Sequence, residues 1–291
     1  MKIELKNIEK QYGEKQVLYD INLTFEKGMV GLLGENGAGK TTLLKIMSSL
    51  SSPTKGEILI DNEPLKKKHT NVRGRIGYLP QMFTPYPFFS VYEFMDYMAI
   101  LAKVKDRKKR IYELLEQVNL EQESKKKIGK LSGGMVRRLG IAQALLPDPE
   151  LLIVDEPTAG LDPEERIRFR NLFALLGETK SIILSTHIVS DIEYSCEKLV
   201  ILNQGHILYN GTSEGLKEKV KGKIWAYQEE ANLIFSKIGK GIDTKNILSA
   251  KRKDKNLILK LYGREQPIKK AKIVEGDLED AYMAIMKEKM I

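Results

Sequence analysis

The chain has 291 residues, of which 42% are hydrophobic and 30% charged, and its net charge is +9. This length suits one large domain with a small one, and the composition is typical of soluble globular proteins. No apolar run approaches the roughly 18 residues that a membrane span needs, and the N-terminus has no signal-peptide core. Because Cys196 is the single cysteine, an internal disulfide and a cysteine-cluster metal site are excluded, and we expect a reducing, cytoplasmic setting.

Three short basic runs contribute to the positive charge: Lys66–Lys68, Arg107–Arg110 and Lys125–Lys127. Such runs are compatible with a nucleic acid or an anionic membrane surface as partner. No aromatic residues alternate with them, as they do on surfaces that stack on bases. We therefore interpret the runs as solvated helix ends and loops and expect no nucleic acid partner.

Residues 1–27 predict an antiparallel opening, because apolar and polar residues alternate around Ile3 and again around Leu23. Tyr12 and Gly13 lie between these two strand-like runs. A tyrosine at such a turn either packs there or stacks on the base of a nucleotide.

Residues 29–47 carry the most specific pattern. An apolar run at 29–33 predicts a buried strand, and Leu43 and Leu44 begin the apolar face of a helix. Between them, residues 34–42 fit the phosphate-loop pattern G-x-x-x-x-G-K-[ST] at every fixed position. Glycines let backbone N–H groups surround phosphate oxygens, and the helix N-terminus adds positive charge. The candidate nucleotide-binding residues here are Asn36, Gly37, Ala38, Gly39, Lys40, Thr41 and Thr42. Lys40 is expected to reach the β- and γ-phosphates, and Thr41 to bind Mg²⁺.

A helical insertion over residues 82–147 is predicted after two more strands, at 57–60 and 75–79. The loop at 82–90 is rich in aromatic residues, namely Phe83, Tyr86, Phe88 and Phe89. Such a loop is either a buried bend or a docking surface for a partner. Two amphipathic helices follow, around residues 91–101 and 111–118.

Ser132, Gly133 and Gly134 precede a third periodic helix. A serine with two glycines at a helix N-terminus is a second candidate anion site. Out of context it is also compatible with a plain N-cap and a flexible turn.

Two apolar strands, at residues 151–154 and 181–186, end in polar side chains. Buried strands suit a parallel sheet, and groups at their carboxyl ends lie where such sheets bind ligands. We expect Asp155 to bind Mg²⁺ and Glu156 to be the general base for a water that attacks the γ-phosphate. The alternative role, capping the next helix, is better met by Asp162, which precedes a proline. His187 follows the second strand and either contacts the γ-phosphate or is structural.

The C-terminal part is predicted to be a small α+β domain at residues 221–291, after an ATP-binding domain at residues 1–220. Asn203, Gln204 and Gly205 predict a hairpin turn, and the polar residues 212–222 a linker. Asp277 can cap a last helix.

Taken together and in this order, the motifs resemble those of the ATP-binding subunits of ABC transporters over residues 1–220. Tyr12 matches the adenine-stacking aromatic of the family, and Gly34–Thr42 matches its Walker A loop. Gln81 matches its Q-loop glutamine, and Leu131–Met135 is similar to its signature. Leu151–Glu156 resembles its Walker B strand, Gly160–Asp162 resembles its D-loop, and His187 resembles its switch histidine. Met135 stands where the family signature usually has glutamine, which puts the strength of dimer closure in question.

The resemblance implies an α/β fold built on a phosphate-loop NTPase core, with an antiparallel N-terminal subdomain. It also implies ATP and Mg²⁺ as cofactors, with Gln81 as a catalytic residue that also binds the metal. ATP would lie between the Walker A loop of one subunit and Ser132–Gly134 of a second, which is an identical or closely related chain. A separate membrane-spanning subunit would dock at the aromatic loop and hold the protein at the inner face of the cell membrane.

Three functions are compatible with this pattern. The favoured one is an ATPase that powers transport, and the short tail is similar to that of drug and antibiotic exporter subunits. The second is a soluble ABC-type ATPase acting on nucleic acid or the ribosome, although those relatives typically have two ATP-binding units, long coiled coils or zinc-binding cysteines. The third, a binder that does not hydrolyse ATP, is disfavoured because Glu156 and His187 are both present.

Overall fold

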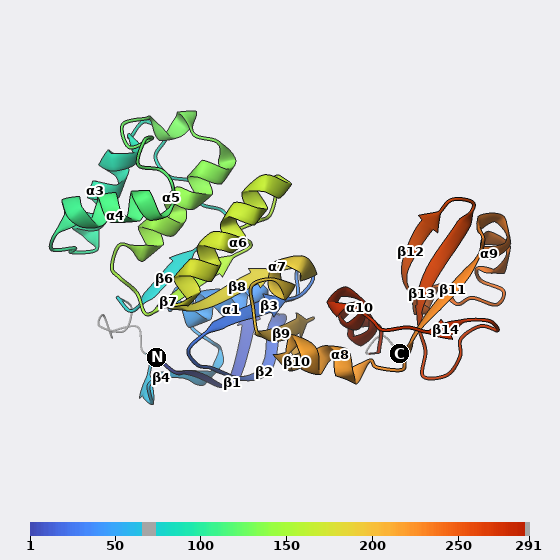
Figure 1. Ribbon diagram of the computed structural model, residues 1–291. Helices are drawn as coiled ribbons and strands as arrows, with labels where there is room; N and C mark the ends of the chain where they lie inside the picture. The colour runs from blue at the N-terminus through green and yellow to red at the C-terminus, as the bar shows by residue number, and fades with distance from the viewer. Residues whose placement is uncertain (66–73, 289–291) are drawn as a thin grey trace. The chain divides into compact units, whose positions relative to one another are not determined.

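The computed structural model describes residues 1–65 and 74–288, so the basic run Lys66–Lys68 lies outside the described residues. Contacts divide the chain into two compact units, Met1–Ile207 and Leu208–Ile291, which are described separately (Figure 1). No helix of the described residues is long and apolar enough to cross a membrane.

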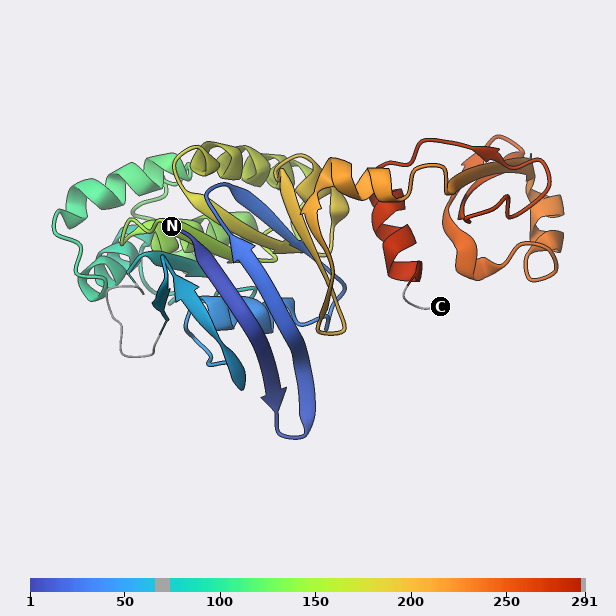
Figure 2. The same ribbon diagram turned by 90° about the horizontal axis from the view of Figure 1, so that it is seen from below.

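The first unit begins with an antiparallel sheet, as the alternating N-terminal sequence predicts. Its strands are β1 (Ile3–Tyr12), β2 (Lys15–Phe25), β4 (Lys55–Ile60) and β5 (Glu63–Pro64), in the order β2-β1-β4-β5. The long hairpin of β1 and β2 is prominent in Figure 2. The sheet buries one face, because the apolar residues of β1 and β2 alternate with polar ones.

A six-stranded sheet forms the centre of the first unit, and only its edge strand β10 continues beyond Ile207, the last residue of that unit. Its strands are β3 (Met29–Leu33), β6 (Ile76–Leu79), β7 (Leu151–Asp155), β8 (Ser181–Thr186), β9 (Lys198–Asn203) and β10 (His206–Thr212). The order is β10-β9-β3-β8-β7-β6, and the pairs from β9 to β6 are parallel. All residues of β7 and β8 are buried, which is the pattern of strands covered on both faces.

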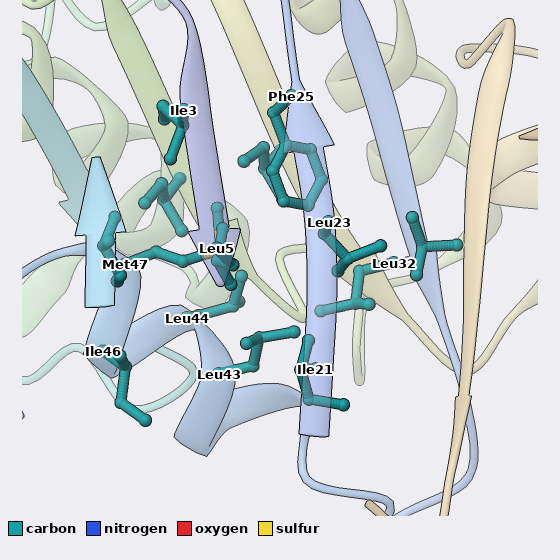
Figure 3. Packing of buried hydrophobic residues seen from close by; sticks show 14 of the residues in the cluster. Ile3, Leu5, Ile21, Leu23, Phe25, Leu32, Leu43, Leu44, Ile46 and Met47 are labelled. Atoms are coloured by element: carbon teal, nitrogen blue, oxygen red, sulfur yellow. The ribbon is translucent and has the colours of Figure 1, made fainter. Parts of the chain in front are cut away.

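Helix α1 (Lys40–Met47) joins the two sheets through a common hydrophobic core. Leu43, Leu44 and Met47 of this helix are fully buried, in one cluster with apolar residues of β1, β2 and β3 (Figure 3). This packing holds the N-terminus of α1 at the carboxyl end of β3, because only the loop 34–39 separates them.

The predicted helical insertion contains α3 (Val91–Leu101), α4 (Arg107–Gln117), the short 3₁₀ turn η1 (Ile128–Lys130) and α5 (Gly133–Leu145), and Figure 1 shows the three helices grouped together. Ser90 and Glu93 form a capping box at the start of α3. Helices α6 (Pro163–Gly177) and α7 (Val189–Glu193) contact β8. The predicted cap of α6 is confirmed, since Asp162 accepts a hydrogen bond from the Glu165 N–H.

The second unit is a small α+β structure. It contains α8 (Ser213–Lys219), β11 (Ile224–Glu230), α9 (Ala231–Lys237), the 3₁₀ turn η2 (Thr244–Asn246), β12 (Ile247–Lys253), β13 (Asn256–Tyr262), β14 (Lys272–Ile273) and α10 (Leu278–Glu288). The strand order is β12-β13-β11-β14, and neighbouring strands are antiparallel. Tyr227 and Ile234 lie in its hydrophobic core, and Asp277 accepts from the Asp280 N–H at the start of α10.

The predicted linker at residues 212–222 is wrong in part, because α8 occupies most of it. Thr212 caps this helix by accepting the Gly215 N–H, and Leu216 is fully buried. The lysine-rich composition is typical of a linker, whereas the apolar Leu216 and the N-cap residue Thr212 favour a helix. The domain limits at residue 220 stay a prediction.

Candidate nucleotide-binding site

The phosphate-loop pattern lines a cleft of about 330 Å³ in the first unit. The loop continues from buried strand β3, and α1 begins at Lys40. Gly39 precedes the helix with φ 108°, a conformation that favours glycine over residues with a side chain. The cleft is lined by Val17, Glu35, Asn36, Gly37, Gly39, Lys40, Thr41, Thr42, Gln81 and Glu156.

Lys40 is held in place by the first two residues of the loop and by Glu156, which follows β7. Its ammonium donates hydrogen bonds to the carbonyl oxygens of Gly34, at 2.6 Å, and Glu35, at 3.2 Å. It also lies 3.0 Å from Oε1 of Glu156, and both side chains are almost completely buried. The lysine therefore presents a fixed positive charge in the cleft, which suits recognition of phosphate.

Asp155 and Glu156 are brought to the same edge by the parallel strands. Ser185, on the neighbouring strand β8, donates its hydroxyl to Oδ1 of Asp155 at 2.5 Å and accepts the Glu156 N–H at 3.1 Å. Glu156 has φ 49°, which is uncommon for a residue with a side chain and turns the chain sharply at the end of β7. Nδ1 of His187 lies 2.7 Å from Oε2 of Glu156, so the histidine and the carboxylate form one hydrogen-bonded pair.

Two buried oxygen atoms at this edge have no hydrogen-bond partner among residues 1–65 and 74–288. They are Oδ2 of Asp155 and Oε1 of Glu156, whose contact with Lys40 is an ion pair without hydrogen-bond geometry. Buried polar atoms without partners are rare in proteins and indicate an ion, a water or a ligand. Carboxylate oxygens together with the Thr41 hydroxyl are ligands that Mg²⁺ prefers, so the donor set fits a magnesium nucleotide.

Gln81 follows β6 and lines the cleft, as the motif order requires. The Arg137 guanidinium donates to the carbonyl oxygen of Pro80 at 3.1 Å and so connects α5 to the loop that carries Gln81. Burial lowers the pKa of Arg137 from its ordinary value, although the charges of Asp155 and Glu156 act in the opposite direction. Because an arginine side chain stays protonated in proteins, Arg137 still adds positive charge near the two carboxylates.

The other predicted site residues do not line this cleft. Tyr12 ends β1, opposite Lys15, and its ring is half exposed with the Lys10 ammonium 4.8 Å from its centre. Ser132 caps α5 by accepting the Met135 N–H, while Gly133 is exposed. Sequence reasoning missed Ser185 and Val17, and the signal for Ser185 was a small polar residue at the polar end of an apolar strand.

Three comparisons with known proteins agree with this geometry. The family model described as ABC transporter matches residues 18–159. The Nod factor export ATP-binding protein I of Burkholderia orbicola is 38% identical over 226 residues, which are 76% of this chain and 74% of that protein. This chain is an ATP-binding subunit of the ABC transporter family. The Linearmycin resistance ATP-binding protein LnrL of Bacillus subtilis is 35% identical over 224 residues, 76% of this chain and 72% of its own length.

A solved structure supports the same assignment to the ABC family. It is a dimeric ATP-binding cassette in a post-hydrolysis state with ADP and phosphate, with a TM-score of 0.65 and 29% identity over 72% of this chain and 98% of that chain. The ABC subunit described here thus has the predicted fold and is an ATPase that powers transport. The relatives do not favour the alternative of a soluble ATPase acting on nucleic acid or the ribosome.

Proposed function

We propose that this ABC subunit hydrolyses ATP in the cleft around Lys40 to drive export through a separate membrane-spanning subunit. The observation that carries the hydrolytic role is the chain of contacts from Lys40 through Glu156 to His187, beside the unpartnered oxygen of Asp155. Export is supported by the names of the two relatives, one an export protein and the other a resistance protein.

Each residue has a distinct task in this proposal. Lys40 and the loop N–H groups would hold the phosphates. Thr41, Asp155 and Gln81 would hold Mg²⁺, which would supply positive charge against the negative charge of the phosphates. Glu156 accepts a proton from the attacking water, and His187 orients this carboxylate through the bond at Nδ1. Ser185 fixes the positions of Asp155 and Glu156 through its two hydrogen bonds.

A second ATP-binding subunit completes the site in this proposal. Ser132 and Gly133 lie exposed at the N-terminus of α5, outside the lining of the cleft, where they can meet a phosphate from another chain. Gly134, the third residue of the predicted set, is buried in this subunit. The dimeric cassette with ADP and phosphate supports this arrangement. Because Ser132 supplies the cap of α5, the helix begins normally although Met135 replaces the usual glutamine.

The base-stacking role of Tyr12 leads to a test. Its ring is about half exposed and therefore available to adenine. Tyr12→Ala is expected to weaken ATP binding by about 1–3 kcal/mol, the usual contribution of a base–aromatic stack, whereas Tyr12→Phe should keep it. Equilibrium titration with ATP measures both, and an unchanged dissociation constant in Tyr12→Ala would remove the tyrosine from the site.

The aromatic loop is partly a half-buried bend and partly an exposed surface. Phe83 packs edge-on against Phe94, and Phe89 packs against Tyr97. Met82 and Phe88 each expose 84% of their surface. Large apolar side chains with this exposure favour a protein partner, and we propose that they contact the membrane subunit, which keeps the protein at the inner face of the cell membrane.

Replacing both Met82 and Phe88 with serine should reduce recovery of a multi-span membrane protein in pull-down from detergent extract. ATP binding should survive, because neither side chain lines the nucleotide cleft. The matched control is Leu50→Ser, since Leu50 is also strongly exposed, at 64%, but lies just after α1. Equal recovery by the double variant and the control would place the docking surface elsewhere.

A further inference from the structure

The turn between β9 and β10, residues Asn203–His206, has no role in the nucleotide site described above. Gln204 and Gly205 both have positive φ, 46° and 80°, which is the pattern of a tight two-residue hairpin turn. The sequence predicts the turn from these residues, but it does not show what the turn touches.

The turn is bonded to the back of the phosphate loop. The Gly205 N–H donates a hydrogen bond of 2.9 Å to the carbonyl oxygen of Ala38. The carbonyl oxygen of Leu202, one residue before the turn, lies against Gly34, where an added methyl group would approach it to 2.3 Å. A methyl group added at Gly39 would lie 3.5 Å from the Leu202 side chain. The hairpin therefore lies against the first residue of the loop, Gly34, and against its last two residues, Ala38 and Gly39.

The same turn is also bonded to β2. The Tyr19 N–H donates to the carbonyl oxygen of Gly205 at 3.0 Å, and the rings of Tyr19 and His206 stack with centres 4.5 Å apart and planes 11° apart. A methyl group added at Gly205 would lie 2.3 Å from the carbonyl oxygen of Val17, which is a residue of the cleft lining. The backbone of the turn thus has no free space on this side.

We propose that the turn Asn203–His206 is a positioning element that holds the phosphate loop in its phosphate-binding shape. This inference rests on the proposed role of residues 34–42 as the nucleotide site. A loop binds phosphate through several N–H groups aimed at one point, so any freedom in its backbone must be lost on binding. The bond from Gly205 to Ala38 removes part of that freedom in advance, while the Tyr19–His206 stack holds the turn against β2.

Gly205→Ala should raise the KM for ATP about tenfold, which corresponds to about 1.4 kcal/mol of binding, with kcat within about twofold of wild type. The turn touches no catalytic side chain, so binding should change and the chemical step should not. ADP affinity, measured by calorimetry, should fall by the same factor as ATP affinity. The matched control is Gly222→Ala, because Gly222 has φ 72° but no atom of the described residues lies within 4 Å of an added methyl group. The control should keep the wild-type KM.

A second variant, His206→Ala, tests the same proposal if Gly205→Ala fails to fold. His206 is exposed, so His206→Ala should leave the fold intact while removing the ring stack, and should raise KM and the ADP dissociation constant about threefold. His206→Phe should restore both values, which a merely structural loss would not do. Wild-type KM and ADP affinity in His206→Ala, and in Gly205→Ala where it folds, would overturn the proposal. If Lys40→Met also bound ATP normally, the nucleotide site itself would be misassigned, and the two failures are therefore distinguishable.

Discussion

Glu156→Gln is expected to lower the rate of ATP hydrolysis by about 10²–10⁴-fold, the usual effect of removing a general base. This corresponds to about 3–5 kcal/mol of activation free energy. Glutamine has the size of glutamate and can keep the contact with His187, but it cannot take a proton from water. Because the Lys40 ammonium keeps its bonds to Gly34 and Glu35, ATP binding should change little.

The Glu156→Gln variant also tests whether ATP brings two subunits together. ATP that is bound and not hydrolysed stabilises the paired state by mass action, so Glu156→Gln should elute as a dimer with ATP and Mg²⁺ and as a monomer without them. The matched control is Glu164→Gln, because Glu164 is strongly exposed in α6 and pairs with Arg168. The control should hydrolyse ATP at the wild-type rate. Near-normal hydrolysis by Glu156→Gln would show that another group accepts the proton.

The parts of the site that could be predicted from sequence are those that depend on local patterns. Strand, glycine loop and helix follow one another within residues 29–47, so the position of Lys40 follows from the motif itself. Asp155 and Glu156 were predictable for a different reason, since the carboxyl ends of parallel strands meet at one edge of a sheet.

Contacts between distant segments were not predictable in the same way. The bridge from Ser185 to both Asp155 and Glu156 spans about thirty residues, and the bond from Gly205 to Ala38 spans far more. Both contacts depend on the strand order β9-β3-β8-β7, and this order cannot be predicted from any single stretch of sequence. Helix α8 was not predicted, because its lysine-rich composition is typical of a linker and Leu216 is its one buried leucine.

Lys40→Met is expected to weaken ATP binding by about 10²-fold or more. Hydrogen bonds to charged groups contribute about 1.5–3 kcal/mol each, and Lys40 is proposed to contact two phosphates. Methionine keeps a similar length and apolar stem but has no charge. The change has a second consequence, because Glu156 then loses the cation that lies 3.0 Å away in a buried site. Leaving a buried charge without its partner can cost about 3–5 kcal/mol of stability.

A double variant separates these two effects of Lys40→Met. Lys40→Met with Glu156→Gln removes the unpaired charge together with the cation, so its thermal unfolding temperature should return toward the wild-type value. Its ATP affinity should stay low, because no positive charge has been restored to the cleft. Calorimetric titration with ATP and thermal unfolding measure the two quantities independently. If the double variant regained both stability and ATP affinity, Lys40 would serve the fold by neutralising Glu156 and would not be the residue that binds phosphate.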